Sequence, residues 1–245
     1  MAPSWVWPVA IAPFIGSFLS VVVVRAADPR SILWERSRCT ACGHTLCARD
    51  LIPLMSWLVL RARCRFCAAP ISVFYPLMEV AAVGVATWAA LSSELAMWPT
   101  ALLGWMLLGL AATDFKYYLL PDFLTIPLLA IGLATNWMLD RANISSYVIG
   151  AGAGFGFIVL LRFAYRLWRL REGIGLGDAK LMAGVGAWVS WQGLPTVVFL
   201  AALFGLSGTL LRSRGKQLPT LTERAPFGAY LCVALWVVWL YGPLQ

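Results

Sequence analysis

The sequence predicts an all-α polytopic membrane protein with about eight transmembrane helices and one small polar domain between the first two. Three observations lead to this fold class. Hydrophobic residues make up 61% of the chain and charged residues only 12%, a composition typical of integral membrane proteins. Long apolar runs alternate with short polar segments, and the basic residues gather in alternate segments.

The first apolar run, from Ser4 to Val24, has 21 residues, which is enough to cross about 30 Å of hydrocarbon. No Lys or Arg precedes it, whereas a cleaved signal peptide begins with a basic region and has a shorter apolar stretch. We therefore expect a retained transmembrane helix. Seven further apolar runs are expected to be spans, at about 74–92, 96–113, 119–139, 144–168, 179–191, 194–211 and 226–242.

The basic residues indicate the orientation of these spans. If the N-terminus is external, the internal loops are 25–73, 114–118, 162–180 and 212–225, and they hold 18 of the 19 Lys and Arg residues. Only Arg141 lies outside. This distribution is the positive-inside pattern of membrane proteins. The net charge of +8 therefore indicates topology and contact with membrane lipid, and a nucleic-acid partner is not needed to explain it.

The polar segment 25–73 contains two C-x-x-C pairs. Cys39 and Cys42 form the first pair, and Cys64 and Cys67 form the second, with 21 residues between the pairs. Four thiolates at this spacing are typical of one tetrahedral structural zinc site. Zinc would supply folding energy to a short segment that has little core of its own. We expect a zinc-binding cytoplasmic loop domain here.

The same four cysteines have two alternative interpretations, disulfides and an iron site. Two disulfides are disfavoured because the predicted compartment is reducing, whereas iron in the same four-thiolate geometry remains open. His44 and Cys47 lie nearby but are expected to be ordinary loop residues. Cys232, in the middle of the last span, is expected to be a small buried apolar residue.

Two aspartates follow from the topology as a candidate catalytic pair. Asp114 ends the third span and Asp178 begins the sixth, so both lie on the predicted cytoplasmic side. Asp178 stands in the motif Gly175-Leu-Gly177-Asp178-Ala-Lys180, where glycines permit close approach of another chain. Two carboxylates in one pocket share a proton, so one acts as general base towards water and the other polarises a carbonyl. His44, the only histidine, lies beside the cysteines, so no serine or cysteine dyad competes.

Three further features concern the depth and surroundings of this pair. The run from Ala179 to Trp191 has only 13 residues, or roughly 20 Å of helix, so Asp178 is expected slightly inside the cytoplasmic boundary. Asp122 follows Pro121 at the start of a span, where an acidic group favours the helix N-terminus. Glu79 lies about one turn inside the second span; it either pairs with a loop arginine or lines the same cavity, and the sequence does not decide.

Taken together, these motifs resemble one family, the bacterial type IV prepilin peptidases. The likeness covers nearly the whole chain and occurs in order: Gly16-Ser-Phe-Leu-Ser20, the two C-x-x-C pairs, Ile52-Pro53, Pro70-Ile-Ser72, Tyr75-Pro-Leu-Met-Glu79, Asp114, Leu120-Pro121-Asp122, Gly175-Leu-Gly177-Asp178-Ala-Lys180 and Pro226-Phe-Gly228. The resemblance implies an intramembrane aspartyl protease of the bacterial inner membrane. It would remove a short basic leader from type IV prepilins or pseudopilins.

The resemblance also assigns residues and cofactors. Asp114 and Asp178 match the two catalytic aspartates of the family, and the four cysteines match its zinc-binding loop. The resemblance further implies N-methylation of the new N-terminus with S-adenosylmethionine, although no residue is assigned to the methyl donor. Gly175, Gly177, Lys180, Asp122 and Glu79 are expected to support the site. The implied domains are 1–24, a first helix; 25–73, a zinc-binding domain associated with methyl transfer; and 74–245, a seven-helix protease domain.

Departures from the family pattern leave alternatives open. Ser20 and Leu51 stand where the family usually has asparagine, and the Ser20 position belongs to the region linked to methyl transfer. A peptidase without methyltransferase activity is therefore one alternative. A second is a proton-coupled transporter that uses Asp114 and Asp178 as a proton relay, but this reading does not explain the cysteine loop. A purely structural assembly factor leaves the glycines around Asp178 unexplained.

Overall fold

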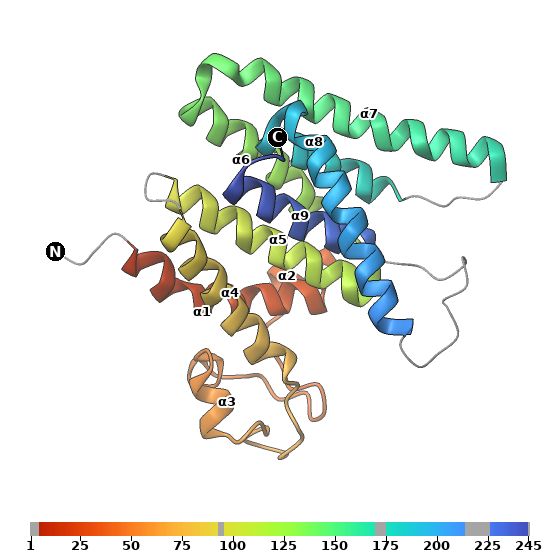
Figure 1. Ribbon diagram of the computed structural model, residues 1–245. Helices are drawn as coiled ribbons and strands as arrows, with labels where there is room; N and C mark the ends of the chain where they lie inside the picture. Colours follow the sequence, from red (N-terminus) through yellow and green to blue (C-terminus); the bar gives the residue numbers. More distant parts are fainter. Residues whose placement is uncertain (1–4, 93–95, 170–174, 214–225, 245) are drawn as a thin grey trace. The chain divides into compact units, whose positions relative to one another are not determined.

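The computed structural model describes residues 5–92, 96–169, 175–213 and 226–244 (Figure 1). Throughout these ranges the regular structure is helical, with two isolated β-bridges in the loop domain. The predicted all-α class is confirmed. The chain packs as two compact units, residues 1–109 and residues 110–245. This division describes packing, so the predicted assignment of activities to 1–24, 25–73 and 74–245 stays a prediction.

The first unit is built on two long helices, α1 (Val6–Val24) and α4 (Phe74–Ser92), which pack against each other. A Cβ at Gly16 of α1 would lie 2.5 Å from the Cα of Glu79 in α4. Only glycine permits so close a crossing, a device common between membrane helices. The helix α5 (Met97–Tyr117) begins in this unit and runs past its boundary; Trp105 of α5 donates from Nε1 to the Ala82 carbonyl of α4 at 3.0 Å.

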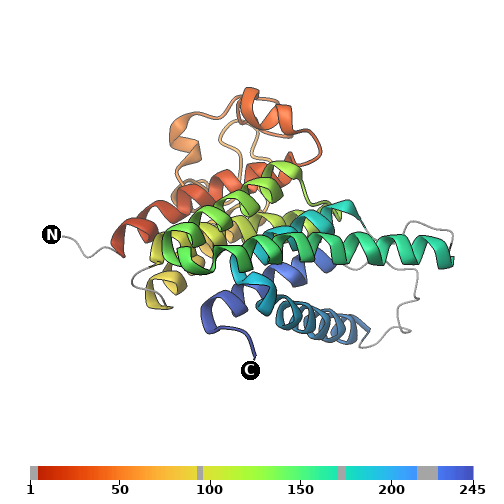
Figure 2. The same cartoon turned by 90° about the horizontal axis from the view of Figure 1, so that it is seen from above.

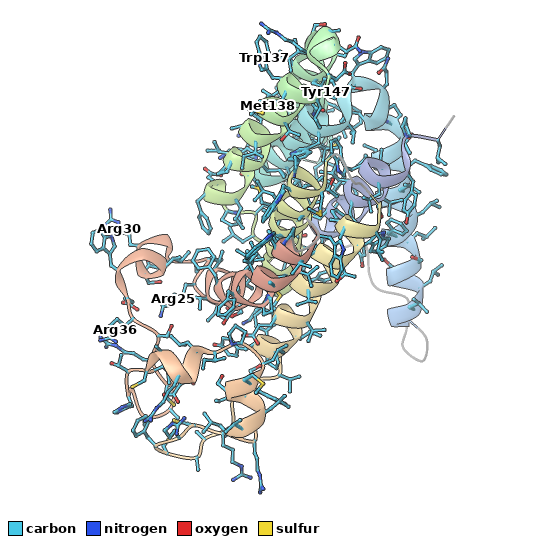
Figure 3. All side chains as sticks on the ribbon, turned by 90° about the vertical axis from the view of Figure 1, so that its left-hand side faces the viewer. Arg25, Arg30, Arg36, Trp137, Met138 and Tyr147 are labelled. Carbon is cyan, nitrogen blue, oxygen red and sulfur yellow. The ribbon has the colours of Figure 1, made fainter. Side chains whose placement is uncertain are left out.

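Between α1 and α4 the chain forms a loop domain of short elements: α2 (Pro29–Trp34), η1 (Ala48–Leu51) and α3 (Met55–Val59). Figures 1 and 2 show this domain beside the ends of α1 and α4. Arg25 fastens its start, because the guanidinium donates to the carbonyls of Glu35 at 2.8 Å and Arg36 at 3.3 Å. Arg25, Arg30 and Arg36 are seen on this part of the chain in Figure 3.

The second unit contains α6 (Asp122–Leu139), η2 (Arg141–Asn143), α7 (Ile144–Arg169), α8 (Leu176–Ser213) and α9 (Phe227–Tyr241), together with the end of α5. The helix α8 packs against α6, α7 and α9. Its contact with α7 is made by glycines, because a Cβ at Gly186 would clash with the Gly150 carbonyl oxygen. At one end of α6 and α7, Trp137, Met138 and Tyr147 lie near each other (Figure 3).

The helix α8 is broken at Ser190, whose backbone has φ 61° and ψ 179°. Figure 1 shows that α8 changes direction along its length. A break leaves helix carbonyls without partners, and Asn136 of α6 serves two of them by donating from Nδ2 to Ala187 at 2.9 Å and Trp188 at 3.3 Å. The two halves, 176–189 and 191–213, correspond to the predicted runs 179–191 and 194–211.

Five helices of the described chain are long and apolar enough to cross a membrane: α1, α4, α6, α8 and a stretch that includes most of α7. The protein is therefore a multi-pass membrane protein. The count of eight spans is not confirmed, because α8 enters this count once, α9 has only 15 residues, and α5 is not among the five. The predicted basic loop 212–225 lies almost wholly outside the described residues, as does part of the loop before Gly175.

Candidate active site and metal centre

Asp114 lies near the C-terminal end of α5 and is buried, with 6% of its surface exposed. Its Oδ2 atom accepts the backbone N–H of Ala229 at 2.8 Å. Ala229 belongs to the first turn of α9, where N–H groups have no intrahelical partner and the helix dipole favours negative charge. The Asp114 carboxylate therefore binds the N-terminus of α9 and satisfies one of its free N–H groups.

Asp178 lies in the first turn of α8 and is half-buried. It is close enough to Asp114 for the two carboxylates to interact electrostatically, and the backbone of Gly175 also contacts its side chain. The thiol of Cys232 in α9 lies within electrostatic range of both carboxylates. This cysteine is buried, as the sequence predicts. The fold thus brings two aspartates, 64 positions apart in the numbering, into one local environment.

Leu120 joins the segments that carry the two aspartates. Its Cβ lies 3.0 Å from where a Cβ at Gly177 would stand, and its Cδ1 lies 2.8 Å from the corresponding point at Gly228. The Leu120 side chain is thus enclosed between the starts of α8 and α9, and only 8% of the residue's surface is exposed. Gly177 and Gly228 are needed here because any larger residue would push Leu120 or a carboxylate away.

An ion pair lies beside this site. Lys180 Nζ contacts both carboxylate oxygens of Asp122 at 2.6 Å. Asp122 begins α6 and Lys180 lies two residues after Asp178, so the pair ties the first turns of α6 and α8 together. The Asp122 side chain is 57% exposed, and an exposed pair of this kind contributes little to stability. Its effect is mainly on position.

Glu79 is held in the first unit by a backbone partner. Its Oε2 atom accepts the N–H of Leu54, at the start of α3, at 2.7 Å. Glu79 is 6% exposed. Neither of the two roles left open by the sequence describes this contact, which fastens the loop domain to α4.

The four cysteines of the two C-x-x-C pairs converge. The Sγ atoms of Cys39, Cys42, Cys64 and Cys67 all lie within 4.8 Å of one another, and those of Cys39 and Cys67 are 3.8 Å apart. Four thiolates placed tetrahedrally at about 2.3 Å from zinc would be about 3.8 Å from each other. The arrangement therefore fits a metal ion bound by four cysteines. A disulfide requires sulfurs about 2.05 Å apart, and all six cysteines are free.

The two C-x-x-C pairs share one backbone conformation. The N–H of Cys39 donates to the carbonyl five residues later at 2.9 Å, and that of Cys64 does the same at 2.8 Å. Gly43 and Ala68 then donate back to the Cys39 and Cys64 carbonyls at 2.9 and 3.0 Å. Both turning residues have positive φ, 70° for Gly43 and 56° for Ala68. This repeated turn is what directs each pair of sulfurs to one point.

Hydrogen bonds shape the cysteine cluster and hold its two halves together. Backbone N–H groups of Cys42 and Ala41 lower the pKa of Cys39 to about 6. The Ala69 N–H acts to lower the pKa of Cys67, but burial and the sulfurs of Cys42, Cys64 and Cys39 outweigh it and raise that pKa to about 11. Burial alone would raise the pKa of Asp50, but hydrogen bonds from Arg65 and from the Cys47 backbone hold it below its usual value. The Arg65 Nε donates to Asp50 Oδ1 at 2.9 Å, which joins the second cysteine pair to η1.

His44 and Cys47, which the sequence analysis expected not to be metal ligands, make other contacts in the loop. The His44 ring stacks on Phe66, with ring centroids 3.6 Å apart. Cys47 lies outside the sulfur cluster and donates its backbone N–H to Asp50 at 3.3 Å. Both are loop residues, as expected.

Sequence reasoning missed three parts of the aspartate site: the N–H donor of Ala229, the enclosed Leu120 and the nearby Cys232. Pro226-Phe-Gly228 was noted as a motif, and a proline followed by a glycine at a helix start was the available signal. The partner of that motif is Asp114, more than a hundred residues earlier, so only the tertiary structure reveals the contact.

Comparison with known proteins agrees with this description. Residues 11–93 match the bacterial peptidase A24 N-terminal domain, and residues 101–210 match the type IV leader peptidase family. A prepilin leader peptidase/N-methyltransferase from Aeromonas hydrophila is 41% identical, over 93% of this chain and 87% of that protein. Proteins of the same name from Pectobacterium carotovorum subsp. carotovorum and Pseudomonas putida are 37% and 35% identical, over 89% and 93% of this chain and 86% and 87% of those proteins.

No solved structure matches the chain. The two family models together cover most of the sequence, and the relatives are matched over most of their own length. This protein belongs to the type IV leader peptidase family.

Proposed function

We propose that this protein is an intramembrane aspartyl endopeptidase that removes the short basic leader from type IV prepilins or pseudopilins. The observation that carries the proposal is that the segments of Asp114 and Asp178 enclose the same side chain, Leu120, with the two carboxylates near enough to interact electrostatically, in a member of this family. The related proteins are named prepilin leader peptidase/N-methyltransferase. The proposed location is the bacterial inner membrane, with the N-terminus external and the site near the cytoplasmic face.

The proposed chemistry uses one proton shared by the two carboxylates. One carboxylate, deprotonated, takes a proton from a water molecule as that water attacks the scissile carbonyl. The other, protonated, donates a hydrogen bond to the carbonyl oxygen and stabilises the charge that develops on it. Asp178 is the more exposed of the two, so water and substrate reach it more readily. The N–H of Ala229 fixes Asp114.

Gly175 gives the substrate backbone room to approach. It precedes Asp178 without a side chain and is exposed, whereas Gly177 makes room for Leu120. A peptide whose leader ends at the membrane surface would present its scissile bond at this depth. The short first half of α8, residues 176–189, keeps Asp178 near that surface.

A second activity is proposed for the same chain, methylation of the new N-terminus with S-adenosylmethionine. Support comes from the names of the relatives and from the tetracysteine loop domain. The residues Cys39, Cys42, Cys64 and Cys67 would hold structural Zn²⁺, which stabilises the loop fold when bound. No residue is assigned to the methyl donor.

The test of both activities is incubation of the purified protein with a candidate prepilin, with and without S-adenosylmethionine, followed by mass spectrometry. Loss of the leader mass supports the peptidase, and one added methyl group that depends on S-adenosylmethionine supports the transferase. Cleavage without methylation would reject the transferase alone. An intact precursor under all conditions would reject the proposed function and return attention to a proton-coupled transporter, which the family comparison does not favour.

The zinc proposal has a separate test, the metal content of the purified protein. Wild type is expected to hold one zinc ion, and Cys39→Ser and Cys64→Ser are expected to lose it. Cys47→Ser is the matched control, because Cys47 lies in the same loop outside the sulfur cluster. Equal metal content in all four proteins would reject the site, and iron in place of zinc would correct the identity of the ion.

A further inference from the structure

The loop domain carries a short stretch of exposed apolar side chains, here called the 51–59 segment. It runs from the end of η1 through α3. Five of its large hydrophobic side chains are exposed, by 42 to 72%: Leu51, Ile52, Met55, Leu58 and Val59. Exposed apolar side chains that gather in one short stretch are typical of surfaces that bind a protein or a membrane, whereas singly scattered ones are not.

The 51–59 segment is fastened at a definite depth along α4. The hydrogen bond from the Leu54 N–H to Glu79 Oε2, 2.7 Å long, holds the start of α3 against α4. Glu79 lies five residues after Phe74, the first residue of α4, which is roughly 7.5 Å along the helix axis. Because α4 is one of the five candidate membrane spans, its first turns are expected at the level where headgroups meet acyl chains, and Leu54 of the segment is bonded there.

The backbone around the segment is constrained. Leu54, before α3, has φ 59°, and Arg61 and Ala62, after it, have φ 50° and 58°. Left-handed conformations are unfavourable for residues other than glycine, so surrounding contacts hold them. Leu54 is the residue that Glu79 binds. The segment is therefore presented in one orientation relative to α4.

Positive charge flanks the segment. Arg49 precedes it and Arg61 and Arg63 follow it, and all three side chains are exposed. The whole stretch 25–73 has eight arginines against three carboxylates, and Asp50 is already paired with Arg65. Apolar side chains next to long cationic side chains are typical of segments that lie in the membrane interface, because the stems contact acyl chains while the charges reach the headgroups.

We propose that the 51–59 segment docks on the surface of the surrounding membrane. Its apolar side chains enter the boundary between headgroups and acyl chains, and Arg49, Arg61 and Arg63 bind anionic headgroups. Positive charge and depth beside α4 favour anionic lipid over a second copy of this chain, whose same surface would bring arginines together. This inference does not rest on the proposed peptidase activity.

The cysteine domain would then be held by two contacts. Glu79 binds it to α4, and the docked segment binds it to lipid. Each arginine near an anionic surface is expected to shift the docked population by roughly fivefold. The docked state would therefore depend on the fraction of anionic lipid, and high salt would weaken it by screening.

The test is hydrogen–deuterium exchange of the full-length protein in nanodiscs of phosphatidylcholine alone or mixed with phosphatidylglycerol. Peptides that cover residues 51–63 are expected to exchange several-fold more slowly when phosphatidylglycerol is present, and high salt is expected to reverse the effect. Arg61→Gln combined with Arg63→Gln, and separately Leu58→Asn combined with Val59→Asn, are expected to remove the lipid dependence. Trp34→Asn, an exposed apolar position of the same domain at 85% exposure, is the matched control and is expected to keep it.

Zinc content, measured on each variant, shows whether the domain remains folded. The wild-type lipid comparison stands without any variant, so an unfolded variant does not decide the outcome. Equal exchange of 51–63 in both lipid mixtures would overturn the proposal. Slower exchange only after addition of a prepilin would also overturn it, and would assign the surface to the substrate instead.

Discussion

Gly228→Ala is the substitution whose effect follows most directly from the geometry of the aspartate site. A Cβ at position 228 would lie 2.8 Å from Leu120 Cδ1 and 3.1 Å from Asp114 Oδ2. Carbon atoms in contact are normally 3.5–4.0 Å apart, so one of these neighbours has to move. Leu120 is confined on its other side, because its Cβ lies 3.0 Å from the corresponding point at Gly177.

The expected loss has two parts. Overpacking of a tight contact costs about 1–3 kcal/mol, whereas the better helix propensity of alanine over glycine returns up to about 1 kcal/mol. The net loss of stability is therefore expected to be at most about 3 kcal/mol. Cleavage is expected to fall further, by about tenfold to a hundredfold, because small displacements of a catalytic group are costly to rate. The displaced group here is Asp114, at its bond with Ala229.

The assay is the initial rate of prepilin cleavage by purified variants, with thermal unfolding measured on the same samples. Gly156→Ala is the control, since a Cβ there meets nothing within 4 Å and the residue is exposed on α7. It is expected to cleave at the wild-type rate and to unfold no more easily. A Gly228→Ala protein with the wild-type rate would refute the inference that this glycine makes room for Leu120 and Asp114.

Three other changes test separate contacts. Asn136→Leu removes the donor to the carbonyls at the α8 break and is expected to lower the free energy of unfolding by about 1–3 kcal/mol; an unchanged unfolding temperature would contradict this. Asp122→Lys and Lys180→Asp are each expected to slow cleavage, and the double exchange to restore part of the rate; a double variant as slow as the worse single would argue against the pair. Ala68→Gly relieves a left-handed alanine and is expected to stabilise the loop by up to about 1 kcal/mol, seen as slower loss of metal to a chelator. Faster loss would show that the Ala68 methyl contributes packing.

Much of the helical architecture could be predicted from the sequence because its physical cause is local. A segment in hydrocarbon has to satisfy its own backbone hydrogen bonds, so an apolar run of sufficient length forms a helix. The run expected at 74–92 is α4 with the same bounds, and the run expected at 226–242 is α9, Phe227–Tyr241. The cysteine cluster could also be predicted, because two C-x-x-C pairs need only a turn each and one metal ion.

The contacts that shape the aspartate site were beyond sequence reasoning because they are long-range. Leu120 gave no pattern of its own, yet its side chain is enclosed by two glycines from different helices. The partner of Glu79 is a backbone N–H in an irregular loop 25 residues earlier, and the hydrophobic periodicity of the sequence does not predict such a contact. The number of membrane crossings was also harder to predict than the helices themselves, since the break in α8 depends on Ser190 and on Asn136 from another helix.

The central claim is that Asp114 and Asp178 together cleave the leader. Asp114→Asn and Asp178→Asn keep the size of each side chain and remove its ability to ionise, so their direct test is prepilin cleavage by the two purified variants in lipid. Asp140→Asn is the matched control, because this aspartate ends α6 and bonds to Asn143 and Tyr147. We expect no detectable leader removal by either Asp114→Asn or Asp178→Asn, with zinc content retained, and wild-type cleavage by Asp140→Asn. Robust cleavage by either of the first two variants would contradict the two-aspartate mechanism.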